Sequence, residues 1–313
     1  MLLVIIVSCT KKEMKYILSI AFFCTVFQGA SQNYFDIANL TYIDTPANNF
    51  KVSNDQTAVN ELNLEVNFPL VLSKKTILLT GLFANKTRVS LDANVSNSNL
   101  QVLGFNLGIN KTFNDKWSAT FMAYPKISSD NLALSSDNLQ LGFLSLFIKK
   151  KRTNLKYKYG VFVNTEEFGL AVIPIFGLYY LSPNKKFETK LTLPFLADIN
   201  YELNKKLWLG FRFDGIGTSY NLNNQNYSNN GAYVSKNSIE FAPYLRFKMS
   251  KSLYLNTKLG YAFGRNYKVF DADDKIDLAV TSFYFGDNRT RLNEGFSDGA
   301  IFKIELFYRL HFD

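Results

Sequence analysis

The sequence contains very few of the residues on which most catalytic and metal sites depend. Its 313 residues include one histidine and two cysteines. Zinc sites, Cys–His nucleophilic sites and disulfide scaffolds each need several such side chains, so the composition argues against all three. Beyond roughly the first thirty residues, no apolar run reaches the ~18–20 residues that a membrane-spanning helix needs. A polytopic helical membrane protein is therefore excluded.

Aromatic residues and positive charge are abundant. The chain has 29 Phe and 18 Tyr, aromatic residues make up 16% of it, and hydrophobic residues reach 47%. Such a composition argues against disorder across the whole chain. Lys and Arg outnumber Asp and Glu by 35 to 26, which gives a formal net charge of +9.

The N-terminus has the pattern of an export signal. A basic segment precedes a short apolar run, and Gly29 and Ser31 stand at the −3 and −1 positions of a cleavage site. We therefore expect a signal peptide over residues 1–31, with Met14 as the more natural initiator, and a mature chain over residues 32–313. The alternative, a single membrane anchor, would need a longer apolar run.

Basic runs later in an exported chain are solvated turns, so we expect no nucleic-acid partner.

The mature chain alternates between apolar and other residues with a period of two, as β-strands do. Large apolar side chains form one face of each segment, and charged, amide and glycine residues form the other. The segments run to about ten to fourteen residues, whereas strands of soluble sheets average nearer 5–6 and tilted membrane strands need ~9–11. The clearest segments are 61–68, 102–110, 156–164, 239–249, 253–264 and 302–312. This pattern predicts an all-β fold, a transmembrane antiparallel up-and-down β-barrel.

Connections between these segments alternate between short basic turns and longer links, as in outer-membrane barrels. The longer links are residues 86–99, 127–137, 217–237 and 264–297. One segment, 187–203, breaks this alternation. As a single strand it would place its two flanking short turns at opposite ends, and as a hairpin bent at Pro194 its arms would be short for a membrane span. We predict about twelve strands, with fourteen as the alternative, and an even number places both termini in the periplasm.

The C-terminal strand resembles the signal read by the outer-membrane barrel assembly machinery. Its alternating apolar residues are Phe302, Ile304, Leu306, Tyr308, Leu310 and Phe312. Together with residues 35–42, 193–201 and 283–289, this strand resembles an uncharacterised outer-membrane β-barrel family of Gram-negative bacteria, a domain of unknown function. The resemblance implies a porin-like architecture in the outer membrane, with outer-membrane lipid and the assembly machinery as partners. It supplies no catalytic residues.

Enzymatic function has little support in the sequence. Barrel enzymes of the outer membrane rely on a histidine, and the only one here, His311, falls in the last strand at the expected periplasmic rim. The acidic loop residues Asp271, Asp273, Asp274 and Asp277 lack the glycine and glutamate of an EF-hand, so a solvated loop is favoured over a calcium site. We expect a non-enzyme without cofactors. A lipid-modifying enzyme remains a third, disfavoured hypothesis.

The polar faces of the strands give a candidate lumen lining with eight bases and five acids. Its residues are Glu61, Glu65, Lys156, Lys158, Arg212, Asp214, Glu240, Arg246, Lys248, Lys258, Lys303, Glu305 and Arg309. The basic excess predicts a porin-like passive pore for small solutes with mild anion preference, narrowed by the links 217–237 and 264–297. The alternative is a closed structural or binding barrel that acts through its external loops. The oligomeric state stays open.

Overall fold

The computed structural model describes residues 34–93, 97–223 and 227–311. The expected signal peptide, and Phe312 of the expected assembly signal, lie outside these residues. Regular structure in the described part is almost entirely β, with one single-turn 3-10 helix at Ser136–Asn138. None of the helical structure in that part is long and apolar enough to cross a membrane.

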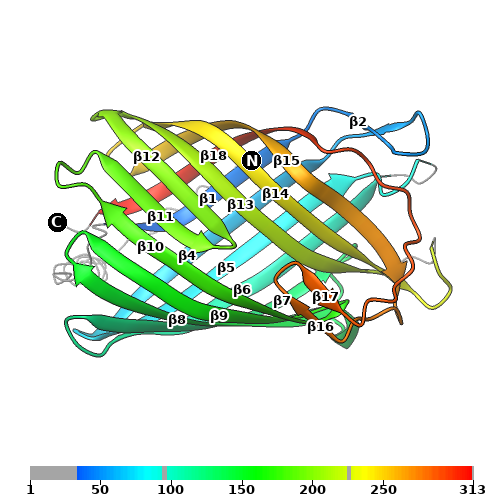
Figure 1. Ribbon diagram of the computed structural model, residues 1–313, viewed down its shortest axis with the longest axis horizontal. Coiled ribbons are helices and arrows are strands. Elements are labelled where there is room, and N and C mark those ends of the chain that lie inside the picture. Colours follow the sequence, from blue (N-terminus) through cyan, green and yellow to red (C-terminus); the bar gives the residue numbers. More distant parts are fainter. Residues whose placement is uncertain (1–33, 94–96, 224–226, 312–313) are drawn as a thin grey trace, which may run out of the picture.

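Fourteen antiparallel strands form a closed barrel (Figure 1). Each barrel strand pairs with the next along the chain, and the last strand, β18, pairs with β1 to close the sheet. The strands are β1 (Tyr34–Asp44), β4 (Asn60–Ser73), β5 (Thr76–Val89), β6 (Ser98–Thr112), β7 (Trp117–Ser129), β8 (Leu139–Arg152), β9 (Leu155–Glu166), β10 (Gly169–Leu181), β11 (Phe187–Leu193), β12 (Leu196–Asn204), β13 (Leu207–Leu222), β14 (Ala232–Lys248), β15 (Leu253–Asp271) and β18 (Gly299–His311).

Four short strands lie in the loops. β2 (Asn48–Asn49) pairs with β3 (Gln56–Thr57) between β1 and β4. β16 (Leu278–Val280) pairs with β17 (Phe283–Phe285) in the long connection between β15 and β18. β16 also runs parallel to β10, so this second hairpin, which we call the flap, is attached to the barrel wall.

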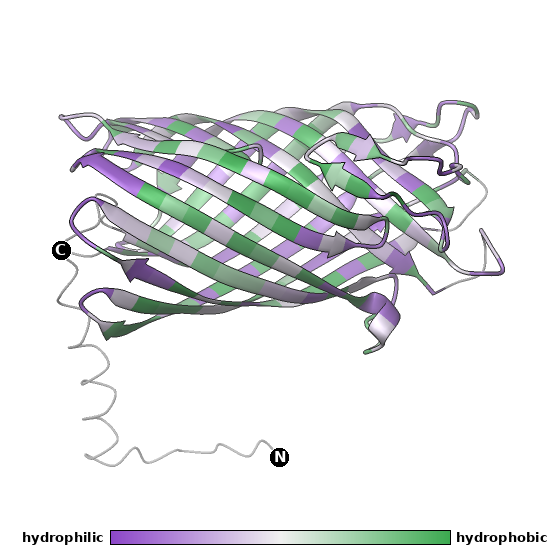
Figure 2. Ribbon diagram, turned by 60° about the horizontal axis from the view of Figure 1, so that its bottom comes forward, coloured by the Kyte–Doolittle hydropathy of each residue, from purple (hydrophilic) through white to green (hydrophobic). Residues whose placement is uncertain are grey.

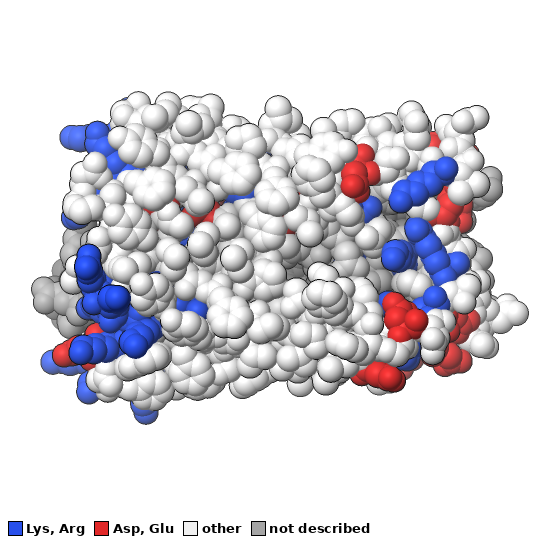
Figure 3. Space-filling model, viewed as in Figure 1, with Lys and Arg blue, Asp and Glu red and all other residues white. Residues whose placement is uncertain are grey.

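The predicted period of two is confirmed along the barrel strands (Figure 2). Leu62 is 48% exposed on the outside of β4, whereas its neighbour Glu61 is 7% exposed on the inside. Exposed apolar side chains therefore cover the outer wall, an arrangement that suits a lipid environment. The face in Figure 3 shows the same division, because its charged side chains gather at the two ends.

Of the two predicted strand counts, the structure has the alternative, fourteen, and the preferred count of twelve is wrong. Residues 187–203, which the sequence left open, form the hairpin β11–β12 with Pro194 and Phe195 at its tip. Its strands, of 7 and 9 residues, are shorter than their neighbours. They are stable because β10 and β13 pair with them on either side.

The two ends of the barrel differ in their connections. Six turns gather at one end, which we call the turn end, and Tyr34 of β1 and His311 of β18 are paired there. These turns are residues 74–75, 113–116, 153–154, 182–186, 205–206 and 249–252. The other end, the loop end, carries the longer connections and the flap. In outer-membrane barrels the short turns face the periplasm.

Candidate functional site

Two cavities occupy the barrel interior. The vestibule, of 950 Å³, opens at the turn end, and its charged lining residues are Lys150, Lys185, Lys186, Glu188, Arg246 and Arg309. The lumen cavity, of 410 Å³, lies further in, and its charged lining residues are Glu61, Lys126, Arg212, Asp214, Lys236, Lys258, Lys303 and Glu305. The interior is thus only partly filled by side chains.

The lumen candidates from the sequence are distributed over both cavities and the inner wall around them. Six line the lumen cavity, namely Glu61, Arg212, Asp214, Lys258, Lys303 and Glu305. Arg246 and Arg309 line the vestibule.

The other five lumen candidates have separate environments. Glu240 accepts a hydrogen bond from Lys303, and Glu65 lines a recess of 190 Å³. Lys158 donates to Thr192 at 3.0 Å. Lys156 and Lys248 lie over tyrosine rings, at 5.8 and 5.7 Å from the ring centroids.

Ion pairs in the barrel interior link side chains of different strands. Nζ of Lys236 lies 2.6 Å from Oε1 of Glu61, and Nζ of Lys258 lies 2.9 Å from Oε2 of Glu305. All four side chains are largely buried. A buried charge is tolerated only with a close partner, so these pairs fix the strands that carry them and narrow the lumen.

The boundary between the vestibule and the lumen cavity is a three-residue ion-pair cluster. Oδ2 of Asp198, on β12, lies 3.4 Å from a guanidinium nitrogen of Arg246 and 3.6 Å from one of Arg212. Arg246 lines the vestibule and Arg212 lines the lumen cavity. Asp198 therefore connects one cation from each cavity, and we call these three residues the constriction.

Several charged residues of the interior were missed by the sequence patterns. They are Asp36, Lys126, Glu166, Glu188, Lys190, Asp198 and Lys236. Three of them lie in the ambiguous segment 187–203, and Lys236 falls in a link that the sequence assigned to a loop. For Asp198, the alternation with Ala197 and Ile199 was the available signal, and the short strands around Pro194 obscured it.

An apolar cluster closes the lumen at the loop end. Inward-facing side chains of five strands pack there with Phe50 and Phe296 from the loops. The strand residues are Val89, Leu100, Val102, Tyr220, Leu222, Ala232, Val234, Tyr267 and Val269. Asn221 of β13 also pairs with Ser129 of β7, which draws these two strands together inside the barrel. We call this cluster the loop-end seal.

The links expected to narrow the pore have different boundaries in the structure. Most of the expected link 217–237 belongs to strands, because β13 runs to Leu222 and β14 begins at Ala232. Likewise β15 continues through the start of the link 264–297, as far as Asp271. The two segments contribute to the loop-end seal through inward-facing residues of their strands. The sequence had assigned these residues to loops.

Arg289 holds the flap and its following loop against the barrel. Its guanidinium lies 4.4 Å from the ring centroid of Phe270 and 5.2 Å from that of Tyr284. Both oxygens of Asp287 accept hydrogen bonds from it, at 2.8 and 3.0 Å. These hydrogen bonds hold the pKa of Asp287 below its usual value, since they favour the ionised carboxylate.

A family model for a domain of unknown function, DUF6268, matches residues 28–284. The chain belongs to this family. The match covers most of the barrel, in agreement with the family resemblance seen in the sequence. No curated protein matches the chain in sequence.

Solved structures similar to this member of the DUF6268 family include three outer-membrane channels and porins. The COG4313 outer membrane channel from Pseudomonas putida F1 has a TM-score of 0.44 and 10% identity, over 91% of this chain and 97% of that chain. The KdgM porin has a TM-score of 0.36 and 10% identity, over 87% and 99%. The NanC porin has a TM-score of 0.35 and 8% identity, over 87% and 100%.

The only histidine of this DUF6268 member and its acidic loop residues have separate hydrogen-bond partners. His311 lines the vestibule, where its Nε2 is 2.9 Å from the hydroxyl of Tyr254. Of the acidic loop residues, Asp271 accepts a hydrogen bond from the amide of Asp273, and Asp274 accepts one from Thr290. Within the described residues, no three side chains of His, Cys, Asp or Glu converge to hold a metal ion.

Proposed function

We propose that this protein is a narrow, gated outer-membrane channel for small anionic solutes. The observation that carries the proposal is the pair of cavities in the interior, separated by a constriction of ionic side chains. A barrel with a purely structural role needs no such space, because side chains can fill its interior.

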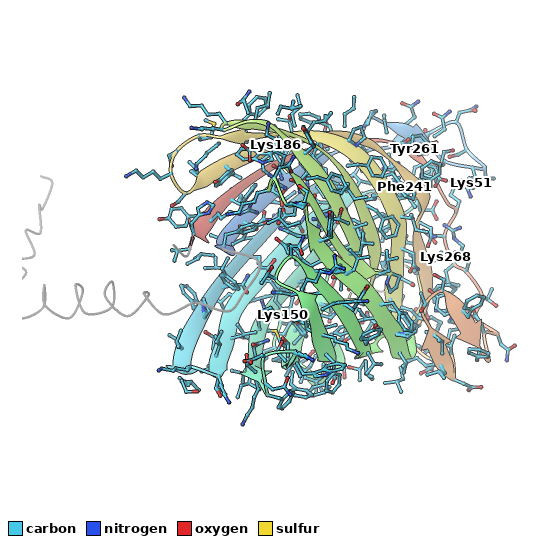
Figure 4. All side chains as sticks on the ribbon, turned by 60° about the vertical axis from the view of Figure 1, so that its left-hand side comes forward. Lys51, Lys150, Lys186, Phe241, Tyr261 and Lys268 are labelled. Carbon is cyan, nitrogen blue, oxygen red and sulfur yellow. The ribbon has the colours of Figure 1, made fainter. Side chains whose placement is uncertain are left out.

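The charge of the vestibule supports the preference for anions. Five basic residues and one acidic residue line it. Figure 4 shows two of the bases, Lys150 and Lys186, at the turn end. A basic mouth with low-dielectric walls raises the local concentration of anions and repels cations.

The constriction and the loop-end seal would make the channel selective and mostly closed. At the constriction, Asp198 bridges the guanidinium groups of Arg246 and Arg212, and Arg212 also pairs with Asp214 at 2.7 Å, so ionic side chains narrow the path. At the loop end, the seal presents apolar side chains, and apolar constrictions close pores by excluding water. Conduction would therefore require displacement of the seal.

Single-channel conductance in a planar bilayer tests this function, with a salt gradient to measure ion preference. We expect rare openings with a reversal potential shifted towards the anion. The paired change Lys150→Glu and Lys186→Glu should reduce the shift, since both residues line the vestibule. The control pair Lys74→Glu and Lys75→Glu lies in a turn at the same end, outside the vestibule lining, and should leave it unchanged.

The second candidate function is a closed binding barrel that acts through its loops, and the loop-end seal favours it. Silent bilayers from folded wild-type protein and from a variant with a weakened seal would support this candidate and overturn the channel.

We also propose that the protein is not an enzyme. Lipid hydrolysis that folded protein performs and that His311→Ala abolishes would overturn that proposal.

A further inference from the structure

The barrel wall is incomplete on the loop-end side of the hairpin β11–β12. β10 pairs with β11 only from Phe176 to Leu181, and β13 pairs with β12 only up to Asp214. Beyond these residues β10 and β13 continue towards the loop end without a described barrel strand between them. Figure 1 shows the hairpin ending partway along the barrel, with the flap nearer the loop end.

A groove of 340 Å³ occupies this gap in the wall. One side is formed by residues of β9 and β10 that face the barrel interior, such as Phe162 and Ile173. The opposite side is formed by the outer faces of β13, β14 and β15, including Phe213 and Phe263. The groove joins the inner surface of β9 and β10 to the outer surface of β13, β14 and β15, because β13 turns into the barrel at this level. There Glu166 of β9 accepts hydrogen bonds from the amide and the hydroxyl of Ser219 of β13.

The groove has an apolar floor and a polar, basic rim. Pro194 and Phe195 of the hairpin tip form the floor, and the ring of Phe195 packs edge-on against Phe162 at 5.6 Å. Lys268 lies at the rim and is exposed (Figure 4). Lys268 is the basic side chain among the groove-lining residues, and the acidic one, Glu166, is paired with Lys126 at 3.2 Å. This rim complements an anionic group, and the floor complements a hydrocarbon.

We propose that the groove binds one single-chain amphiphile from the outer leaflet, with its acyl chain on the hairpin tip and its anionic head group at Lys268. The outer faces that form one side continue into the exposed apolar wall, so an acyl chain can reach the groove from lipid. Its volume lies near the lower limit of ligand pockets, about 300–1,000 Å³, which suits one chain. The site stands whether or not the lumen conducts.

The groove also adjoins the lumen cavity. Phe195, Gly215 and Ile216 line both spaces. The hairpin tip and this part of β13 therefore form the partition between the bound chain and the barrel interior.

A tryptophan reporter and brominated ligands test the site. In the background Trp117→Phe/Trp208→Phe, which removes both native tryptophans, Phe162→Trp places a reporter in the groove on a side that faces the barrel interior. We expect a brominated single-chain carboxylate to quench its emission. The outward-facing control Phe211→Trp should be quenched as well, whereas Phe83→Trp in the lumen cavity should not.

Three further measurements compare the single-chain carboxylate with phospholipid and control for a reporter variant that fails to fold. Tyr284→Trp, on the flap, provides a second reporter in the groove. Lys268→Glu should weaken binding of the carboxylate about two- to five-fold, and Lys74→Glu, in a turn outside both the vestibule and the groove, should not. Brominated phospholipid should quench Phe162→Trp less than the single-chain carboxylate does.

The proposal is overturned if neither groove reporter in folded protein is quenched by the carboxylate. It is also overturned if phospholipid quenches as strongly, because the groove would then hold an ordinary bilayer chain.

Discussion

The amide of Gly215 donates a hydrogen bond to the carbonyl of Phe195 at 2.9 Å. This bond attaches the tip of the short hairpin to β13 at the level where pairing with β12 ends. Because both residues line the lumen cavity and the groove in the wall, the bond stabilises the partition between the two spaces.

Replacement of Gly215 tests how closely the hairpin tip must approach β13. A Cβ atom at this position would collide with the carbonyl oxygen of Pro194, so Gly215→Ala should displace the tip. We expect a loss of about 1–3 kcal/mol in the free energy of unfolding. In the control Gly217→Ala, the added Cβ would meet only Oδ1 of Asn237, at 3.4 Å. Equal losses in urea unfolding of the two variants would contradict the account.

Removing one partner of a buried ion pair should cost more than removing both charges. Lys236→Met leaves Glu61 buried without its partner at 2.6 Å, and we expect a loss of about 3–5 kcal/mol. Adding Glu61→Gln removes the remaining charge and keeps an acceptor for the hydroxyl of Tyr267. The double variant should recover part of the loss in a double-mutant cycle, and strict additivity would show that the pair is not coupled.

Truncation within the loop-end seal should increase channel opening. Tyr220 is 1% exposed, and its hydroxyl donates to Asn85 at 3.3 Å across the interior. Tyr220→Ala removes this ring and should raise the fraction of time that the channel is open in a planar bilayer. Tyr220→Phe keeps the ring and should behave like the wild type. An unchanged open fraction in folded Tyr220→Ala protein would show that the seal does not gate the channel.

Acid should release the loop that follows the flap. The pKa of Asp287 is below its ordinary value of 3.8 because of hydrogen bonds from Arg289. A carboxyl group with a lowered folded-state pKa contributes stability that is present above the unfolded value and lost as pH falls through the folded one. We therefore expect the emission of a Tyr284→Trp reporter to change below about pH 3.8. Asp287→Asn should abolish this transition, and its persistence in that variant would assign it to another group.

The barrel could be predicted from the sequence because the alternation of apolar and polar residues shows which side chains lie on each face of a strand. Leu62 and Glu61 already show which face meets lipid, and residues 302–312 do so for the closing strand. Long strands with apolar outer faces indicate a sheet that closes on itself, because an open edge in lipid would leave backbone groups without hydrogen-bond partners. The fold class, the antiparallel order and the shared end of β1 and β18 follow from this pattern.

The interior could be predicted only in part, since it depends on contacts between distant strands. Lys236 and Glu61 are 175 positions apart, and no local pattern pairs them. The groove depends on β11 and β12 being shorter than their neighbours, whereas the sequence left open whether residues 187–203 form one strand or two. The hairpin tip is attached to β13 by the hydrogen bond from Gly215 to Phe195, a tertiary contact that no local pattern reveals.

The most direct test of the proposed channel measures access to the lumen cavity from each side of a bilayer. Both cysteines of the chain precede residue 32, so Thr41→Cys in protein expressed as residues 32–313 provides a single thiol in that cavity. Ser73→Cys, exposed at the turn end, establishes orientation. We predict that a small anionic methanethiosulfonate added at the turn end modifies Thr41→Cys faster than its cationic counterpart, and faster than the same reagent added at the loop end. Equal rates for both charges and both sides would contradict the account.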